Sequence, residues 1–393
     1  MQLPDVQEIK KHFPFHRICV LKNLLLLVQC IIISRTICLN KLKAKAAIAT
    51  SNKTINQENV YARFIRFFGM KCIDVFCICI GLLIMTLVCT ETCSYLTLDR
   101  TNWKIGTKNV NILSIGVILP CNIYIPIICT ILDKRGNSNQ KERITLLNKL
   151  LKFWPKPDFK VTILADREFI GMDWIDTLID KSISFIVRLR KNTYINNLAS
   201  DFEKTPEKML RYIKRKVNQN GFFISELCVN GTKCYFIAVL DTTKSKEKYT
   251  YFISDIESVK EIIDTYNKRW TIEIFFKNVK TNGFNLEDLN MTDPDKIQLA
   301  ACVVGFAYVL AIVEGIEQVK YKPIPMKSYK NRDKTEFVDY MAVSLFTVGY
   351  NMLQIKVHTV LDLLDYILKS ILIDVDLNFS KLKHYLNPRK KSV

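Results

Sequence analysis

The spacing of hydrophobic and polar residues divides the chain into helical and strand-rich stretches. Apolar positions interspersed with Lys and Arg in 21–42 and 59–68 predict helices within a basic region spanning residues 1–70. From residue 91 the texture changes to short apolar or alternating runs, typical of strands with helices between them. Strands are predicted at 95–99, 110–119, 121–130, 161–165 and 184–190, and helices up to about residue 154 and near 173–181. Strands and helices that alternate in this way indicate an α/β fold.

The polar, lysine-rich stretch 191–250 has a pattern of its own. Two alternating runs, 222–230 and 232–240, flank Asn230-Gly231, a dipeptide that favours a hairpin turn. We interpret this stretch as a small β-rich insertion, and a strand at 249–254 follows it. Helices are predicted at 294–318, 335–354 and 360–371. The domain limits are then 1–90 (helical and basic, predicted to face a polyanion), 91–190 (core), 191–250 (insertion), 251–325 (core) and 326–393 (helical, with a basic tail).

The most informative motif is a set of four polar residues, Tyr266, Arg269, Glu273 and Lys280, spaced as Tyr-x2-Arg-x3-Glu-x6-Lys. At about 100° per helical residue, all four fall within roughly 60° of one helix face. A carboxylate beside two cations and a phenol suits a site that binds metal and phosphate together. The alternative is an ordinary amphipathic helix with an Arg269–Glu273 pair one turn apart.

Capping signals delimit this helix. Ser258 and Glu261 form a capping box, and Asn282-Gly283 predicts a left-handed stop, so the helix should span about 258–281. An apolar stripe beside the polar face is predicted to place that face next to the core; its members are Ile263, Trp270 and Ile274.

Charge and composition narrow the function classes. The 57 Lys and Arg residues exceed the 38 Asp and Glu residues, a net charge of +19, which favours a polyanionic partner. An anionic membrane surface is the competing explanation. The two apolar runs at 24–33 and 75–90 are short for a membrane span and are predicted as buried helices, without stable membrane association. The N-terminus does not resemble a signal peptide.

The cysteine and histidine content indicates the cellular compartment and the kind of metal site. The 13 cysteines are odd in number and lie mostly in apolar runs, which favours free thiols in a reducing cytoplasm over a disulfide framework. The four histidines lie near the chain ends, so a histidine zinc site has little support. A metal should therefore be held by carboxylates, which favours Mg²⁺ or Mn²⁺.

Two acidic residues at the ends of predicted strands complete the candidate site. Asp99 is the last residue of the strand at 95–99, and Asp166 comes directly after the strand at 161–165. Because ligands collect beyond the carboxyl ends of strands in open α/β sheets, these two acids and Glu273 are predicted to converge on two divalent ions. Each aspartate alone has a purely structural alternative, as a turn or loop residue.

The order of these motifs resembles that of the DDE transposases of insertion sequence family four. The similarity covers roughly residues 20–310 and includes the blocks LDRTNWKIG, GNSN-x-x-ER, LADREF and TNGFNLED. It implies a ribonuclease-H-like mixed sheet flanked by helices. It also implies that Asp99, Asp166 and Glu273 are metal-binding catalytic acids, and that Tyr266, Arg269 and Lys280 contact the DNA backbone.

The resemblance further implies a reaction and an assembly. Such a transposase cleaves each element end with two Mg²⁺ or Mn²⁺ ions, commonly through a hairpin intermediate, and joins the 3′-hydroxyl ends to target DNA. A homodimer on paired double-stranded DNA ends, in the cytoplasm at the nucleoid, is expected. A catalytically silent DNA-binding relic and a membrane-associated protein are the alternatives.

Additional residues receive weaker predictions. Lys277, Arg188 and Arg190 are candidate DNA contacts, and Arg100, Arg167 and Glu168 are expected to pair near the acids. Some relatives stack a flipped base on a Trp of the insertion, but no Trp occurs in 191–250. Residues that could stack there instead, or simply pack in a core, are Phe222, Phe223, Tyr235 and Phe236.

Overall fold

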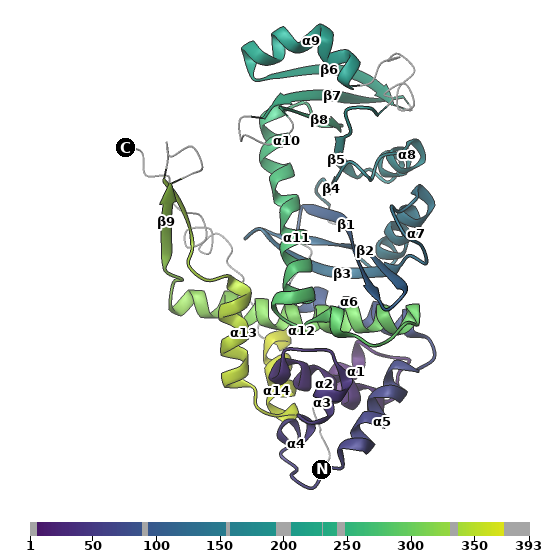
Figure 1. Ribbon diagram of the computed structural model, residues 1–393, viewed down its shortest axis with the longest axis vertical. Helices are drawn as coiled ribbons and strands as arrows, with labels where there is room; N and C mark the ends of the chain where they lie inside the picture. The colour runs from purple at the N-terminus through teal and green to yellow at the C-terminus, as the bar shows by residue number, and fades with distance from the viewer. Residues whose placement is uncertain are drawn as a thin grey trace.

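A central mixed sheet organises the molecule (Figure 1). The computed structural model describes residues 6–88, 93–154, 158–193, 206–229, 231–241, 248–330 and 337–372. Its eight-stranded sheet has the order β3-β2-β1-β4-β5-β8-β7-β6. The strands are β1 Tyr95–Ile105, β2 Lys108–Leu119, β3 Ile123–Ile131, β4 Thr162–Ala165, β5 Ser184–Leu189, β6 Phe222–Val229, β7 Thr232–Leu240 and β8 Tyr249–Ser254. β1, β4 and β5 run parallel, and the remaining neighbours pair antiparallel.

Strand β1 is longer than predicted. We expected it to end at Asp99, but it continues to Ile105 and pairs with β2 along its whole length. Its second half contains polar residues such as Asn102 and Lys104, so an apolar run does not mark this part of the strand. A tight turn at Gly106 then joins β1 to β2, and its φ of 59° is readily accessible to glycine. Asp99 therefore lies within a rigid strand.

The predicted insertion extends the central sheet. β6 and β7 form the expected hairpin, with Gly231 at a φ of 74°, and β7 pairs with β8. A helix that we did not predict, α9 (Pro206–Asn220), packs against this hairpin through its buried Ile213 and Val217. The basic residues of α9 dominated the sequence pattern and masked its narrow apolar face.

Helices cover both faces of the sheet. Figure 1 shows α7 (Gln140–Leu151) and α8 (Met172–Asp180) on one side, and α10 (Val259–Tyr266) and α11 (Trp270–Lys277) on the other. The N-cap of α7 is Asn139, which forms a capping box with Glu142. α11 contacts strands β1 and β3, and Tyr266 at the end of α10 packs against Phe252 of β8.

A helical base lies below the β3 edge and combines N-terminal helices with helices from the C-terminal part of the chain (Figure 1). Its helices are α1 Val6–Lys11, α2 Ile18–Ser34, α3 Leu39–Lys43, α4 Ala46–Ala49, α5 Gln57–Phe68, α6 Ile73–Val88, α12 Pro294–Tyr321, α13 Leu345–Lys356 and α14 Val360–Leu372. Tyr350 of α13 donates to the Ile32 carbonyl at 2.5 Å, and Gln29 of α2 donates to the Val357 carbonyl at 2.9 Å. The N-terminal helices are thus packed against the C-terminal ones.

The helix predicted over 335–354 is wrong in its first half. Phe337–Met341 forms strand β10, which pairs with β9 (Met326–Lys330) in a separate two-stranded ribbon. α13 begins only after Ser344, whose hydroxyl accepts from the Thr347 amide.

Among the residues that the structure describes, one helix, α12, is long and apolar enough to cross a membrane, and 89% of its most apolar stretch is buried inside the protein. Helices α5 and α6 satisfy the same criteria only as a pair, bent by 96°. Core helices of folded proteins share these properties. The segment predicted as a buried helix from residue 75 corresponds to α6, whose apolar residues pack in the main core.

Candidate active site

The helix that carries the four-residue motif is interrupted at two points. We predicted one helix over 258–281; the structure has α10, a 3₁₀ turn at Asn267–Arg269, α11 and a π-helical turn at Asn278–Asn282. Ser258 caps its start by accepting from the Glu261 amide at 3.3 Å. Such irregular turns are frequent at functional sites because they redirect individual side chains.

The predicted left-handed stop at Gly283 is wrong. Its φ is −131°, and Asn285, with a φ of 49°, is the residue in the left-handed region. Gly283 is required for a different reason: a Cβ atom there would lie 2.5 Å from the Asn278 carbonyl oxygen. The predicted apolar stripe is also wrong in part, since Trp270 is 59% exposed and Ile274 is 45% exposed. The helix contacts the core through other residues, chiefly Ile272, Phe275 and Phe276.

Strand register brings the two predicted aspartates together. Leu98 of β1 pairs with Ala165 of β4, which in turn pairs with Val187 of β5. The residues that directly follow these three in the chain are Asp99, Asp166 and Arg188. Side chains at matched positions of parallel strands point to the same face. Asp99 and Asp166 thus lie side by side on the face that α10 and α11 cover.

Contacts across this face tie the helix to both aspartates. Arg269 donates to Asp99 Oδ2 at 3.1 Å and to Glu273 Oε1 at 2.5 Å. Tyr266 donates to Asp166 Oδ1 at 3.2 Å, and its ring packs edge-on against Phe252 of β8. These bonds form two groups, Arg269 with both Asp99 and Glu273, and Tyr266 with Asp166. The Arg269 guanidinium lies 5.7 Å from the centre of the Tyr266 ring, so the two groups are in contact.

Burial makes Asp99 the most perturbed acid of this cluster. Removal from water raises the pKa of the Asp99 carboxyl to about 7, although the neighbouring Arg269 and the Arg100 amide act to lower it. The ionised carboxylate is therefore under-compensated by the groups around it. Additional positive charge at this position would stabilise the ionised form.

The three acids do not form a closed metal cage. Among the described residues, no three His, Cys, Asp or Glu side chains gather as a metal-binding group. Arg269 lies between Asp99 and Glu273 and bonds to both of them. The donors nevertheless fit a hard divalent cation chemically, because they are carboxylates and Asp99 is buried with incomplete charge compensation. A metal bound by Asp99 and Glu273 would replace Arg269 as their counter-ion.

The remaining predicted site residues lie around this cluster. Lys280 is mostly buried, pairs with Glu287 at 2.7 Å and donates to the Asn102 carbonyl of β1 at 3.3 Å. Lys277 is exposed on α11. Arg188 is close enough to influence Tyr266 electrostatically, whereas Arg190 is exposed just beyond the end of β5. Their role as DNA contacts remains a prediction.

One functional candidate, Arg143, was missed by the sequence analysis. It is 3% exposed on α7, and its guanidinium donates to the Glu168 carbonyl at 2.7 Å and the Ile170 carbonyl at 3.0 Å, in the loop that follows Asp166. The expected pairing near the acids is present nearby, since Arg100 donates to Glu168 Oε1 at 2.7 Å. The signal available was the GNSN-x-x-ER block, which contains Arg143.

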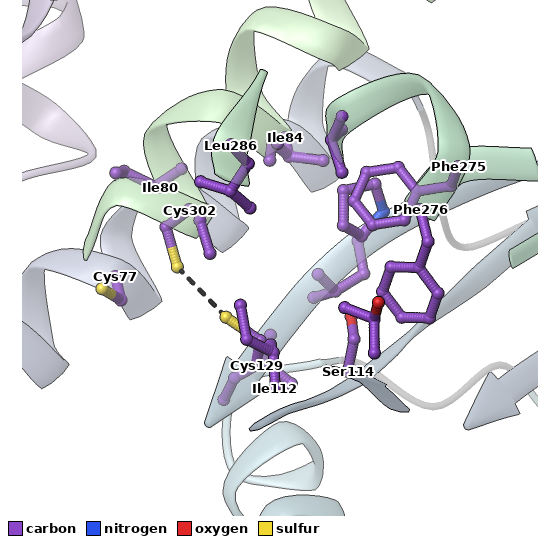
Figure 2. Close-up of a pocket in the computed structure, with 17 residues that line it drawn as sticks. Cys77, Ile80, Ile84, Ile112, Ser114, Cys129, Phe275, Phe276, Leu286 and Cys302 are labelled. Carbon is purple, nitrogen blue, oxygen red and sulfur yellow. Dashed lines mark hydrogen bonds between the residues drawn. The ribbon is translucent and has the colours of Figure 1, made fainter. Parts of the chain in front are cut away.

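The core side of α11 borders a small apolar cavity of about 30 Å³ (Figure 2). Phe275 and Phe276 line it, together with the thiols of Cys129 and Cys302, which lie 3.8 Å apart. The cavity is too small for anything larger than about one water molecule, so we interpret it as a packing gap. The twelve described cysteines are all free thiols.

The fold and the site together define a ribonuclease-H-like protein with acids at matched positions of its central strands. Residues 125–310, a little under half of the chain, match the family model described as "Transposase DDE domain". That range contains Asp166, Tyr266, Arg269, Glu273 and Lys280, and Asp99 precedes it. This part of the chain is therefore similar to a transposase DDE domain.

A solved structure supports the same fold. The chain is similar to the piggyBac transposase in a cryo-EM structure of its synaptic complex with hairpin DNA, with a TM-score of 0.50 at 9% sequence identity. The similarity covers 95% of this chain and 77% of that one. No curated protein sequence matches the chain. The predicted mixed sheet with flanking helices is thus confirmed.

Proposed function

We propose that this protein is a DNA transposase that cleaves and joins DNA strands by metal-dependent phosphoryl transfer. The observation that carries the proposal is the alignment of Asp99 and Asp166 on adjacent parallel strands, beneath the helix that carries Glu273. The match to a transposase DDE domain and the net charge of +19 support it. A protein with that charge is suited to bind a polyanion.

Asp99, Asp166 and Glu273 would hold Mg²⁺ or Mn²⁺. Two such ions activate the attacking oxygen and stabilise the leaving oxygen in phosphoryl transfer. For these acids to bind a metal, Arg269 must first release Asp99 and Glu273. A DNA phosphate is the natural new partner for that guanidinium, since Arg binds phosphates bidentately. Tyr266, bonded to Asp166, would keep that carboxylate oriented.

The finer features of the proposal follow the resemblance to insertion sequence family four. They are a hairpin intermediate, a homodimer on paired element ends and a nucleoid-associated cytoplasmic location. Residues 191–250 contain no Trp, so the base stacking that some relatives use in the hairpin step would need another aromatic residue here. Of the four aromatic candidates, Phe222 is the most exposed, at 41%, whereas Tyr235 and Phe236 are buried. Core packing accounts for the latter two.

Replacing Lys280 by alanine is expected to weaken binding to element-end DNA and to lower the salt dependence of binding by about one unit of slope. The reason is that removing one phosphate contact reduces the number of released counterions. Filter binding or fluorescence anisotropy between about 50 and 200 mM salt measures this slope. Lys320→Ala is the matched control, because Lys320 also pairs with a glutamate, at 2.8 Å, on a different helix. An unchanged slope in Lys280→Ala would exclude a phosphate contact by Lys280.

An experiment can distinguish an active transposase from a catalytically silent relic. Such a protein would bind element ends with the same salt dependence but would not cut them. Incubation of purified protein with element-end DNA in Mg²⁺, with EDTA as the control, distinguishes the two. Strand cleavage that requires Mg²⁺ supports the transposase, and binding without cleavage supports the relic.

A further inference from the structure

Three segments that surround the candidate acids are connected by two buried or half-buried arginines. Arg143 donates to the Ser138 hydroxyl at 2.9 Å and to the Ser138 carbonyl, at the loop before α7. The same guanidinium donates to the carbonyls of Glu168 and Ile170, in the loop that begins at Asp166. Its flat face lies over the Phe169 ring, 5.2 Å from the ring centre. One side chain thus holds both loops.

Arg100 extends this network to the other aspartate. Its backbone amide donates to Asp99 Oδ1 at 2.8 Å, and its side chain donates to Glu168 Oε1 at 2.7 Å and to Asn137 Oδ1 at 2.8 Å. The Arg100 and Glu168 side chains are 16% and 15% exposed, so their ion pair is largely shielded from water. The β1 strand, the loop after β4 and the loop before α7 are therefore fastened to one another.

The geometry assigns Arg143, Arg100 and Glu168 a positioning role: they fix the backbone of Asp166 relative to Asp99 so that both carboxylates can bind the same metal centre. The short strand β4 spans only Thr162–Ala165, so sheet pairing stops immediately before Asp166. Beyond that point the loop is held by the buried Phe169 ring, by the Phe169 amide, which donates to the Asp166 carbonyl at 2.9 Å, and by the two arginines. This inference rests on the proposed metal-dependent function, and it concerns residues that do not themselves bind the metal.

Manganese affinity, measured by electron paramagnetic resonance of free Mn²⁺, tests the role without relying on cleavage. Loss of an outer partner of metal ligands typically weakens metal binding by about 10- to 100-fold. Glu168→Ala should therefore weaken Mn²⁺ binding by at least about 10-fold. Glu168→Gln keeps an oxygen that accepts from Arg100 and should stay within about threefold of the parent. Melting temperatures report whether each variant is folded.

A double-mutant cycle makes the test specific. Arg100→Ala should weaken Mn²⁺ binding as Glu168→Ala does, and the double variant should be no weaker than either single one, because both changes break the same link. Arg143→Met should show the largest loss; if it fails to fold, the Arg100–Glu168 cycle decides. Glu168→Gln as damaging as Glu168→Ala would overturn the inference, because Glu168 would then act as a ligand. Unchanged affinity in all folded variants would overturn it as well, while leaving the proposed function intact. Absence of Mn²⁺ binding by the parent protein would contradict the proposed function itself.

Discussion

Replacing Glu273 by glutamine is expected to abolish cleavage of element-end DNA while leaving end binding nearly intact. Glutamine keeps the size of the side chain and an oxygen that can accept from Arg269, so the helix should keep its place on the sheet. It removes the negative charge that would complete the metal-binding set. Charge stabilisation by a catalytic metal ion is worth several kcal/mol. Since about 1.4 kcal/mol corresponds to a tenfold change in rate, the loss should reach about a thousandfold or more.

The measurement compares cleavage rates and binding affinities of the parent and Glu273→Gln proteins on the same labelled DNA. Glu317→Gln is the matched control, because Glu317 also pairs with a cation, Lys320, at 2.8 Å, but lies near the end of α12 in the helical base. It should cut at the parental rate. If folded Glu273→Gln also cut at that rate, Glu273 would have no role as a metal ligand.

Replacing Gly349 by alanine is expected to be the most damaging small change to the fold. A Cβ atom at this position of α13 would lie 1.9 Å from the Ala311 carbonyl oxygen and 2.3 Å from the Gly315 amide nitrogen of α12. These are backbone atoms that no side-chain rotation can move away. Overpacking of this kind typically costs about 1–3 kcal/mol, and the rigid partners place this case at the upper end.

Chemical denaturation, with the unfolding midpoint as the readout, measures the effect. Gly69→Ala is the matched control, because a Cβ there would make only an ordinary 3.4 Å contact with the Ile65 carbonyl oxygen, and its φ is −95°. We expect a clear fall in midpoint for Gly349→Ala and little change for Gly69→Ala. Equal midpoints for the two variants would mean that α12 and α13 do not approach as closely as described.

The parts of the site that could be predicted from sequence are those set by local patterns. The end of β4 was marked by an apolar run that stops at Asp166, and the helix start was marked by Ser258. Helical periodicity placed Tyr266, Arg269 and Glu273 on one face; Tyr266 and Arg269 do contact the two aspartates of the sheet, and Glu273 accepts from Arg269. These features need no knowledge of distant residues.

The features that sequence analysis missed depend on long-range packing. The second half of β1 is held by pairing with β2, which a polar sequence does not reveal. Trp270 and Ile274 were expected near the core, but the helix has a second apolar stripe on the other side of its polar face, and Ile272, Phe275 and Phe276 of that stripe are the ones buried. Arg143 reaches backbone carbonyls some 25 residues away in the chain, and no periodicity encodes such a contact.

The central claim, that the chain is a metal-dependent DNA transposase, is tested most directly on the DNA that flanks its coding region. Purified protein should be mixed with a supercoiled plasmid that carries both flanks, in Mg²⁺ or in EDTA, and the nicks mapped to single nucleotides. The account predicts nicks at the boundaries of inverted repeats, in Mg²⁺ only, and none with Asp166→Asn. Binding of these ends without any nick in Mg²⁺ or Mn²⁺, or nicks that persist in Asp166→Asn, would contradict it.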